Sequence, residues 1–371
     1  MKQAQREPER EGANVAPRAT VRRRLFWLYR CRAPGVRAQS IQVIQSAWAS
    51  ASRGHEVTLA VQASRPGVGA HEVLRFYGLT PVPTLHLHVL HPHNALAGVQ
   101  HRFVLTRWLA QGGGVVIARS KRYADRLLAW APGRVRVVLE AHEVDSAQAE
   151  ERGQDPRALR QLEARVLSRA VGVVANCEGT AKLLRAQHPS APEMAVLHNA
   201  THVSRRRTPV GPGDGLGYAG SLRPEKDTAI LQHAPLPLDV IGPDRPAGWQ
   251  DLGGVPTCFL GPVPHGELPD RLVRYSALIL TEGGGLFGRS LTSPLKLWDY
   301  LAVGRPVVAA DTPAIQAALA SVGASAVPYT VGDVASFQRA CHRAQDASVS
   351  PIVRTWDERA EQLDDALDRW L

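Results

Sequence analysis

The stretch SPLKLWDYLAVGRPVVAAD, residues 293–311, decides the fold because it joins a sharply bounded helix to a short apolar strand. Ser293 is a good N-cap, and Pro294 suits the first helical position, where no backbone N–H is needed. Gly304 stands where a helix C-cap favours a positive φ, and Pro306 prevents the helix from continuing. Apolar residues recur between these limits at helical spacing, so we expect one helix face to be buried.

The residues after this helix predict a strand and then another helix. PVVAA, 306–310, is apolar on both faces, which is typical of a strand inside a parallel sheet. The DTP tripeptide that follows opens the next helix by the same cap-and-proline pattern. We therefore predict an α/β domain, with Lys296 and Asp299 projecting together from the first helix.

Composition limits the class of protein. The chain has 371 residues, enough for two domains, and 44% of them are hydrophobic, enough for a substantial core. No apolar run reaches the roughly 18 residues of a membrane span, and no secretory signal is visible. The 4 cysteines are isolated and show no metal-site spacing, which favours a reducing compartment. We expect a cytoplasmic protein without a structural metal.

The net charge is +10, and part of it is concentrated in VRRRLFWLYRCR, 21–32, and SRRR, 204–207. Such clusters bind nucleic acid, anionic lipid or phosphorylated small molecules; alternatively, the arginines are spread over solvated faces. No nucleic-acid-binding motif accompanies them, so we expect no specific nucleic-acid partner. Phe26 and Trp27 fit peripheral contact with an anionic inner membrane face, but a buried first strand fits them better.

The order of predicted elements divides the chain into two α/β series. A strand, a glycine-bearing loop, a helix and a second strand form a right-handed βαβ unit near the N-terminus, and the pattern repeats. The polar, Pro- and Gly-rich stretch THVSRRRTPVGPGDG, 201–215, is the best linker, and a second series follows it. The predicted division is a disordered tail at 1–20, an N-terminal domain at 21–203, a C-terminal domain at 204–350 and a final helical segment at 351–371. We predict two Rossmann-like, doubly wound domains that face each other across a cleft.

Several segments resemble one known family. GLGYAGSLRPEKD, DVIGP, FLGPVPHGELPDRL and SPLKLWDYLAVGRPVVAAD occur in this order and resemble the C-terminal domain of retaining GT-B glycosyltransferases, glycosyltransferase family 4 (group 1) in particular. SRGHEVTL, LEAHEV and VLHNATH resemble segments of that family's N-terminal half. The resemblance spans roughly 24–371. It implies that a nucleotide-sugar binds mainly to the second domain, an acceptor to the first, and that the last helix crosses back to the first domain.

The resemblance implies a donor site on the second domain. Asp299 matches an acidic residue that binds the donor ribose, a role that suits a carboxylate because it accepts two hydroxyl hydrogen bonds. The family has a further Glu eight residues earlier, where this chain has Leu291, and Glu282 is the candidate replacement. Lys226 matches a lysine that neutralises the diphosphate. The further predicted donor residues, from the same motifs, are Gly220, Gly242, Pro264, Gly283, Gly284, Thr292, Ser293 and Lys296.

The usual arginine partner of that lysine is absent. Ser221 stands in its place, so either the nearby Arg223 supplies the charge or Ser221 and backbone amides do. On the first domain, His142 matches the family's active-site His and would contact the transferred sugar or the acceptor. Gly35 and Arg37 belong to the first strand-to-helix turn and are expected near the diphosphate or acceptor.

Other classes of site find less support. There is no nucleophile elbow, Walker loop or dinucleotide fingerprint, and no D-x-D pair. HLHVLHPHN, 86–94, has alternating histidines, but no acidic or Cys partner is spaced to complete a metal site, so a wall of the acceptor cleft or plain surface fits better.

The resulting prediction is a glycosyltransferase that moves a sugar from a UDP- or GDP-sugar to a hydroxyl acceptor, with retention and without metal or other cofactor. Retention without a metal is implied by the family, in which the leaving diphosphate takes the acceptor proton. Two alternatives remain: a nucleotide-sugar epimerase of the same fold, and a catalytically silent binding subunit. The acceptor is left open.

Overall fold

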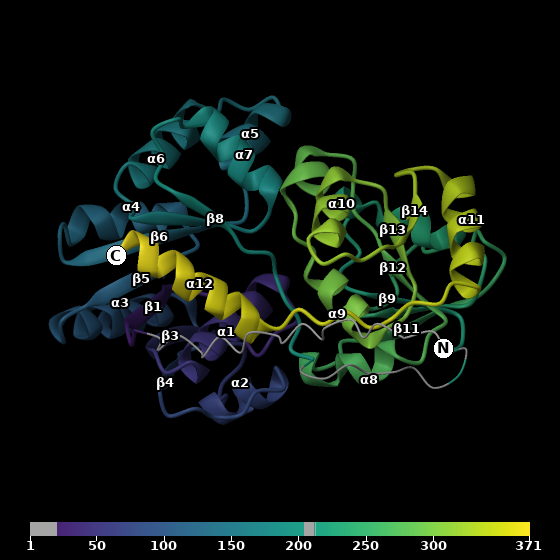
Figure 1. Cartoon of the computed structure of the whole chain (residues 1–371). Helices are drawn as coiled ribbons and strands as arrows, with labels where there is room; N and C mark the ends of the chain where they lie inside the picture. The colour runs from purple at the N-terminus through teal and green to yellow at the C-terminus, as the bar shows by residue number, and fades with distance from the viewer. Residues whose placement is uncertain (1–20, 204–210, 212) are drawn as a thin grey trace, which may run out of the picture.

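The computed structural model describes residues 21–203, 211 and 213–371, which form two α/β units (Figure 1). The predictions for the tail at 1–20 and for the basic cluster at 204–207 lie outside the described residues. Both units are built on parallel sheets whose central strands are apolar on both faces, as the run at 306–310 predicted.

The first sheet has the strand order β4-β3-β1-β5-β6-β7-β8, and short β2 continues the line of β1 beside β3. Its order reverses between β1 and β5, where two neighbouring strands are not consecutive in the chain. Open parallel sheets bind ligands at such a point, beyond the carboxyl ends of the strands. The strands are β1 (Arg24–Leu28), β2 (Arg32–Ala33), β3 (Glu56–Ala63), β4 (Leu85–Leu90), β5 (Gly114–Ala118), β6 (Val135–Ala141), β7 (Gly172–Ala175) and β8 (Met194–Val196).

Helices cover both faces of this sheet. The helices of the first unit are α1 (Ala38–Ser52), α2 (Ala70–Phe76), α3 (Asn94–Ala110), α4 (Lys121–Trp130), α5 (Asp145–Glu151), α6 (Arg157–Leu167) and α7 (Glu178–Gln187). Trp27 packs with α1 on one face, and Phe26 packs with α3 on the other. The interpretation of LFWLY as a buried strand is therefore correct, and Phe26 and Trp27 are not available to a membrane.

The second sheet has the order β11-β10-β9-β12-β13-β14 and reverses between β9 and β12. Its strands are β9 (Leu216–Ala219), β10 (Leu238–Ile241), β11 (Thr257–Gly261), β12 (Ala277–Leu280), β13 (Val307–Ala310) and β14 (Val327–Tyr329). Its helices are η1 (Pro224–Lys226), η2 (Thr228–His233), η3 (His265–Glu267), α8 (Leu268–Leu272), η4 (Phe287–Leu291), α9 (Leu295–Val303), α10 (Pro313–Ala320) and α11 (Val334–Gln345). One apolar cluster fills this unit.

The helix predicted between Ser293 and Gly304 is α9, and its start differs from the prediction. Pro294 occupies the N-cap, and the Ser293 hydroxyl accepts a hydrogen bond from the Asn199 amide at 3.0 Å instead of capping the helix. Because Asn199 belongs to the segment that leaves the first unit, Ser293 ties the two units together. The predicted end is confirmed: Gly304 has φ 66°, in the left-handed region.

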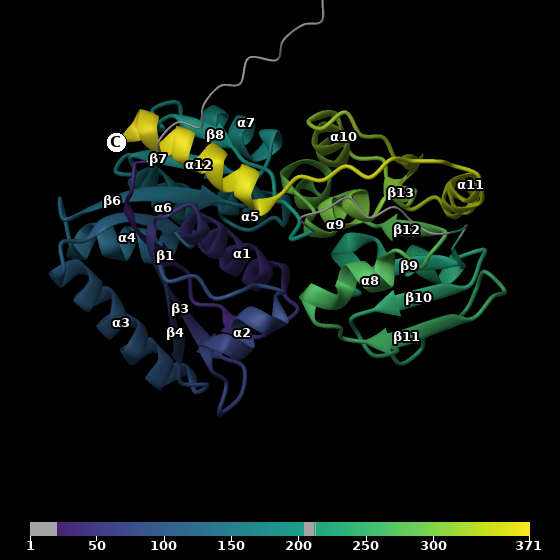
Figure 2. The ribbon, with the colours of Figure 1, turned by 60° about the horizontal axis from the view of Figure 1, so that its bottom comes forward.

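The last helix, α12 (Trp356–Trp370), returns to the first unit and packs against α1 (Figure 2). It begins with a capping box between Thr355 and Glu358. Asp364 holds it in place, because its carboxylate accepts from Arg53 at 2.8 Å and lies 2.7 Å from His55 Nε2. Thr355 also pairs with Thr201, so the two segments that connect the units lie side by side.

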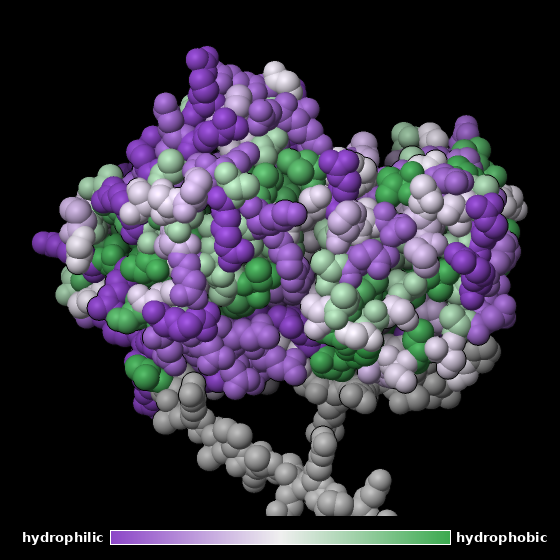
Figure 3. Space-filling view, turned by 45° about the horizontal axis from the view of Figure 1, so that its top comes forward, coloured by the Kyte–Doolittle hydropathy of each residue, from purple (hydrophilic) through white to green (hydrophobic). Residues whose placement is uncertain are grey.

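No helix among the described residues is long and apolar enough to cross a membrane. On the face shown in Figure 3, hydrophilic residues prevail over the first unit, and apolar residues form small separate patches.

Candidate active site

The predicted donor residues converge at the carboxyl edge of the second sheet. Gly220 directly follows β9, Gly242 directly follows β10, and Glu282 lies two residues after β12. β9 and β12 are the pair at which the strand order reverses. The motifs therefore meet where an open parallel sheet binds ligands.

Both glycines are required by the backbone. Gly220 has φ 140° and Gly242 has φ 134°, which side-chain-bearing residues rarely adopt. A Cβ on Gly220 would lie 3.1 Å from Lys296 Nζ, and one on Gly242 would lie 3.1 Å from the Gly220 carbonyl oxygen. The loops after β9 and β10 thus pack closely on each other and on Lys296.

Three charged side chains meet beside these loops. Lys226 Nζ lies 3.7 Å from Glu282 Oε1, and the Glu282 side chain is only 1% exposed. The Lys296 ammonium lies 4.0 Å from the centroid of the Tyr218 ring. Among the described residues, neither Glu282 oxygen nor Lys296 Nζ has a hydrogen-bond partner.

Such unpartnered buried groups are costly, and the pKa of Lys296 reflects this cost. Burial lowers the pKa of the Lys296 ammonium to about 8, although the Glu282 carboxylate opposes the shift. A buried ammonium without a hydrogen-bond partner is suited to bind an anionic ligand.

Asp299 does not project together with Lys296, as the sequence analysis expected. It is buried, its Oδ1 accepts from the Thr201 hydroxyl at 2.6 Å, and its Oδ2 lies 3.4 Å from His265 Nε2. Burial tends to raise the pKa of Asp299, but the contact with His265 outweighs it, so the pKa lies below its ordinary value. Asp299 is thus an ionised carboxylate between the linker and the Pro264 loop, and not a solvent-facing partner of Lys296.

One group of side chains has the composition of a metal site. The ligand atoms of His202, His265 and Asp299 lie within 4.8 Å of one another. Zinc holds such atoms at 2.0–2.2 Å, which places them about 3.3 Å apart. The 3.4 Å between His265 Nε2 and Asp299 Oδ2 fits this spacing, whereas the 4.8 Å limit for the full set is wider than it. The expectation that no metal is needed stays a prediction.

The remaining predicted donor residues differ in their exposure and contacts. Gly283 packs on the Glu225 carbonyl, where a Cβ would come within 2.1 Å. The Arg223 side chain is 58% exposed and lies 3.7 Å from Glu225, so the structure does not bring it to Lys296. Ser221 is exposed, and its carbonyl accepts from the Tyr218 hydroxyl at 2.9 Å. Of the other predicted donor residues, Gly284 is exposed and Thr292 is buried.

Leu291, at the position of the missing family Glu, is anchored in the first unit. Its side chain is 1% exposed and belongs to an apolar cluster of that unit. Its carbonyl accepts from the Asn176 amide at 3.0 Å and from the Thr180 hydroxyl at 3.4 Å. A Cβ on Gly179 would come within 1.8 Å of the Ser290 carbonyl. The segment around η4 is therefore an interdomain contact.

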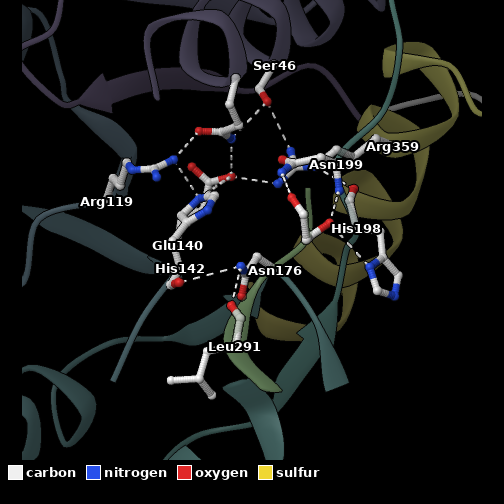
Figure 4. A network of polar contacts seen from close by, with 11 residues as sticks. Ser46, Arg119, Glu140, His142, Asn176, His198, Asn199, Leu291 and Arg359 are labelled. Atoms are coloured by element: carbon white, nitrogen blue, oxygen red, sulfur yellow. Dashed lines mark hydrogen bonds and ion pairs between the residues drawn. The ribbon is translucent and has the colours of Figure 1, made fainter. Parts of the chain in front are cut away.

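His142 lies at the carboxyl end of β6 in a polar network (Figure 4). Its Nε2 is 2.9 Å from Arg119 Nη1. Because a guanidinium only donates, the nitrogen that faces it must carry the lone pair, and the ring proton is on Nδ1. Burial and then the charge of Arg119 lower the pKa of His142 to about 4, so the ring is neutral at physiological pH.

Glu140 is the centre of this network. It accepts from Arg359 at 2.6 Å and from Gln42 at 2.7 Å, and it lies 3.8 Å from His142. Burial alone would raise the pKa of Glu140, but Arg359 and the other donors hold it far below the ordinary value. The positively charged partner comes from α12 and is itself only 2% exposed.

Sequence reasoning missed Arg119, Glu140 and Arg359. Arg119 directly follows β5, at the reversal point of the first sheet, so strand order was the signal that could have found it. Arg359 reaches Glu140 across 219 residues of sequence, and no local pattern marks such a contact.

The Gly35 turn differs from expectation. The Gly35 amide donates to the Tyr77 hydroxyl at 3.0 Å, and that hydroxyl donates to the Gly35 carbonyl at 2.9 Å. The amide is therefore already bonded, and Arg37 is exposed. Of the histidines at 86–94, His86 and His88 are exposed on β4, and His86 lies 3.0 Å from Glu56.

Comparisons with known proteins agree with this architecture. A family model described as a glycosyl transferase 4-like domain matches residues 38–200. No curated protein matches the sequence. The neighbours below are under 25% identical and show the fold alone.

Among solved structures, sucrose-phosphate synthase from Thermosynechococcus elongatus aligns with TM-score 0.65 and 14% identity over 93% of this chain and 95% of that one. Starch synthase IV from Arabidopsis thaliana, bound to ADP and acarbose, aligns with TM-score 0.64 and 11% identity over 94% and 99%. Anabaena HepE in complex with UDP aligns with TM-score 0.56 and 15% identity over 92% and 95%. The chain thus has the GT-B fold of these structures, and its residues 38–200 match a glycosyl transferase 4-like domain.

Proposed function

We propose that this chain transfers a sugar from a nucleoside diphosphate sugar, with UDP or GDP as the nucleotide, to a hydroxyl acceptor. The observation that carries the proposal is the meeting of Lys296 and Glu282 at the reversal point of the second sheet, where the buried ammonium and carboxylate have no hydrogen-bond partner among the described residues. Lys226 stands beside it.

The two lysines suit the departure of a diphosphate. Breaking the bond between sugar and phosphate builds negative charge on the leaving group, so a fixed cation stabilises the transition state more than the ground state. The Lys226 side chain is 27% exposed, whereas the ammonium nitrogen of Lys296 is buried and abuts Gly220. A buried cation acts in a low dielectric, so Lys296 has the larger effect. It takes the part that the sequence analysis assigned to Arg223 or Ser221.

Asp299 and Glu282 suit the hydroxyl groups of the donor. Asp299 is ionised, and each carboxylate oxygen that now accepts one contact retains a further lone pair for the ribose. Glu282 has both oxygens unused. Because Leu291 is anchored in the first unit, Glu282 replaces the missing family Glu as the acceptor of a sugar hydroxyl.

His142 acts as a neutral hydrogen-bond donor on the acceptor side. Arg119 occupies its Nε2, so Nδ1–H is the group that donates to an oxygen of the sugar or the acceptor. The acceptor proton passes to the leaving diphosphate on the same face, which retains the anomeric configuration. This route needs neither a carboxylate pair of the glycosidase kind nor a metal.

The ligands of similar structures support a nucleotide donor. HepE is described in complex with UDP and with UDP-glucose, and starch synthase IV is bound to ADP. These ligands belong to those proteins, and they place UDP and ADP first among the probes.

A thermal-shift panel with UDP, GDP, ADP, CMP and dTDP tests the proposal. A ligand that binds only the folded state stabilises it by about 2.7 kcal/mol at a hundredfold excess over its Kd. We expect one diphosphate to shift the wild type and to fail with Asp299→Ala and Lys226→Ala. Lys182→Ala is the matched control, because Lys182 is exposed on α7. No shift with any nucleotide would overturn the proposal.

Turnover separates the alternatives. We expect release of the nucleoside diphosphate only with an acceptor, and an anomeric configuration retained in the product by NMR. Turnover of the donor without acceptor would indicate an epimerase. Nucleotide binding without any turnover, across a panel of acceptors, would indicate a silent binding subunit.

A further inference from the structure

Helix α3 carries an apolar stripe that no described part of the chain covers. Leu96 is 51% exposed, Val99 66% and Phe103 65%. The three residues are spaced i, i+3 and i+7, so they share one side of the helix. The opposite side is buried against the sheet through Ala97, His101, Leu105 and Trp108.

The surroundings of the stripe are basic. Arg102 and Arg107 are exposed on the same helix, and α3 contains no acidic residue. From Val73 to Ala124, between Glu72 and Asp125, the sequence has no Asp or Glu at all. In a chain of net charge +10, this long stretch without a carboxylate concentrates positive charge on α3 and its neighbours.

The stripe begins at the acceptor side of the first sheet. Arg30, two residues after β1, donates to the Asn94 carbonyl at 3.2 Å, and Arg32 donates to the Asn94 side chain at 3.3 Å. Asn94 is the first residue of α3. The helix therefore starts at the carboxyl edge, where the sheet order reverses, and lies on the outer side of the first unit (Figure 1, Figure 2).

We propose that the α3 face, defined by Leu96, Val99, Arg102, Phe103 and Arg107, docks on an anionic membrane surface. Apolar side chains that project from a helix flanked by arginines are the features of interfacial helices, which enter the headgroup region and attract anionic lipids. The docked face places the acceptor edge at the bilayer, so the acceptor is membrane-borne. This last clause rests on the proposed function; the docking itself does not.

A second copy of the chain fits the same face less well. Twofold symmetry sets a surface against itself, so the arginines of one copy would lie close to those of the other, without carboxylates on α3 to neutralise them. An anionic bilayer supplies the opposite charge. The sign of the charge thus decides between the two occupants.

Co-sedimentation of the full chain with lipid vesicles tests the proposal. We expect binding to vesicles of phosphatidylglycerol and phosphatidylcholine, and little to phosphatidylcholine alone. Val99→Ser with Phe103→Ser, and Arg102→Glu with Arg107→Glu, should each weaken binding about tenfold or more. The matched controls, Leu252→Ser and Arg339→Glu, lie exposed on the second unit and should bind as the wild type does.

Three results would overturn the inference. The first is equal binding by wild type and α3 variants, and the second is no binding to the anionic vesicles. The third is a concentration-dependent dimer in light scattering that Phe103→Ser dissolves. The nucleotide thermal shift, run on the same variants, should stay intact. Its loss in every variant and in the wild type would instead count against the proposed function.

Discussion

Lys296 is the residue whose environment is hardest to explain by folding alone. Its ammonium is buried, has no hydrogen-bond partner among the described residues, and sits on the Tyr218 ring. Folding without a ligand gains little from such a group, because desolvation of the charge exceeds one cation–π contact. A residue that reduces stability in this way is expected to serve a ligand.

We predict that Lys296→Met raises stability and abolishes nucleotide binding. Methionine fills a similar volume without a buried charge, so the free energy of unfolding should increase by about 1–3 kcal/mol. Urea denaturation measures the first effect, and the nucleotide thermal shift measures the second. A variant that is less stable than wild type would show that Lys296 has a structural role instead.

The stabilities of the wild type and Lys296→Met should depend differently on pH. The pKa of Lys296 is lowered from its ordinary value to about 8, so between pH 8 and about 10.4 the unfolded chain binds more protons than the folded one. The loss of stability caused by Lys296 is therefore complete below pH 8 and is relieved above it. We expect the advantage of Lys296→Met to shrink from pH 7 to pH 10. A constant difference across this range would contradict the lowered pKa.

Leu291→Glu would return the carboxylate that the family has at this position. We predict a loss of about 3 kcal/mol or more, since the side chain is 1% exposed in an apolar cluster and a carboxylate there has no partner. Leu291→Met, with a similar volume, is the control and should cost under about 1.5 kcal/mol. If Leu291→Glu were stable and bound donor more tightly, the assignment of that role to Glu282 would be wrong.

At the scale of elements, α12 supports the polar network around His142. Arg359 binds Glu140, the Ser46 hydroxyl and the His198 carbonyl, and so joins β6, α1 and the segment after β8. Glu140 in turn lies beside His142. The last helix therefore supports the network that holds His142, although α12 lies far from His142 in the sequence.

We predict that Arg359→Met destabilises the chain by about 3–5 kcal/mol, because it leaves the buried Glu140 without its charge partner. Glu140→Gln should recover part of this loss in the double variant, and denaturation of all four proteins measures the coupling. Arg369→Met on the same helix is the control, because its pair with Glu193 is half exposed and contributes about 0–1 kcal/mol. Equal losses for Arg359 and Arg369 would refute the buried pair.

Local sequence patterns predicted the helices and strands better than they predicted the contacts between them. The end of α9 at Gly304 and the following β13 were predicted, because a left-handed C-cap and an apolar run depend on neighbouring residues only. Its start was not, because Ser293 bonds to Asn199, which belongs to another part of the fold. In the sequence, a serine that bonds to a distant residue cannot be distinguished from one that caps the helix.

For the whole molecule, the relation between the two units is set by the segments that connect them and by η4. Leu286 N–H binds Glu151 at 2.5 Å, Leu291 packs into the first unit, and Asn199 binds both the hydroxyl and the carbonyl of Ser293. These contacts hold η4 and the residues just before α9 against the first unit.

The metal prediction also belongs to the whole molecule, because His202, His265 and Asp299 come from three separate segments. We expect no zinc above background by elemental analysis, and a nucleotide shift that is unchanged by EDTA. His202→Ala should leave that shift intact, since the role of Asp299 rests on its carboxylate. Stoichiometric zinc that His202→Ala removes would replace the ribose assignment with a metal site.

The sequence by itself determined the two α/β units, the end of α9 and the motifs that follow β9, β10 and β12, because caps, apolar runs and glycines act over a few residues. Only the tertiary structure decided which side chains meet. It separated Asp299 from Lys296, placed Arg359 on Glu140 and anchored Leu291 in the opposite unit. The physical reason is distance along the chain. A charge partner or an apolar contact many residues away leaves no periodic pattern in the sequence, and such contacts are determined by burial and hydrogen bonding across the fold.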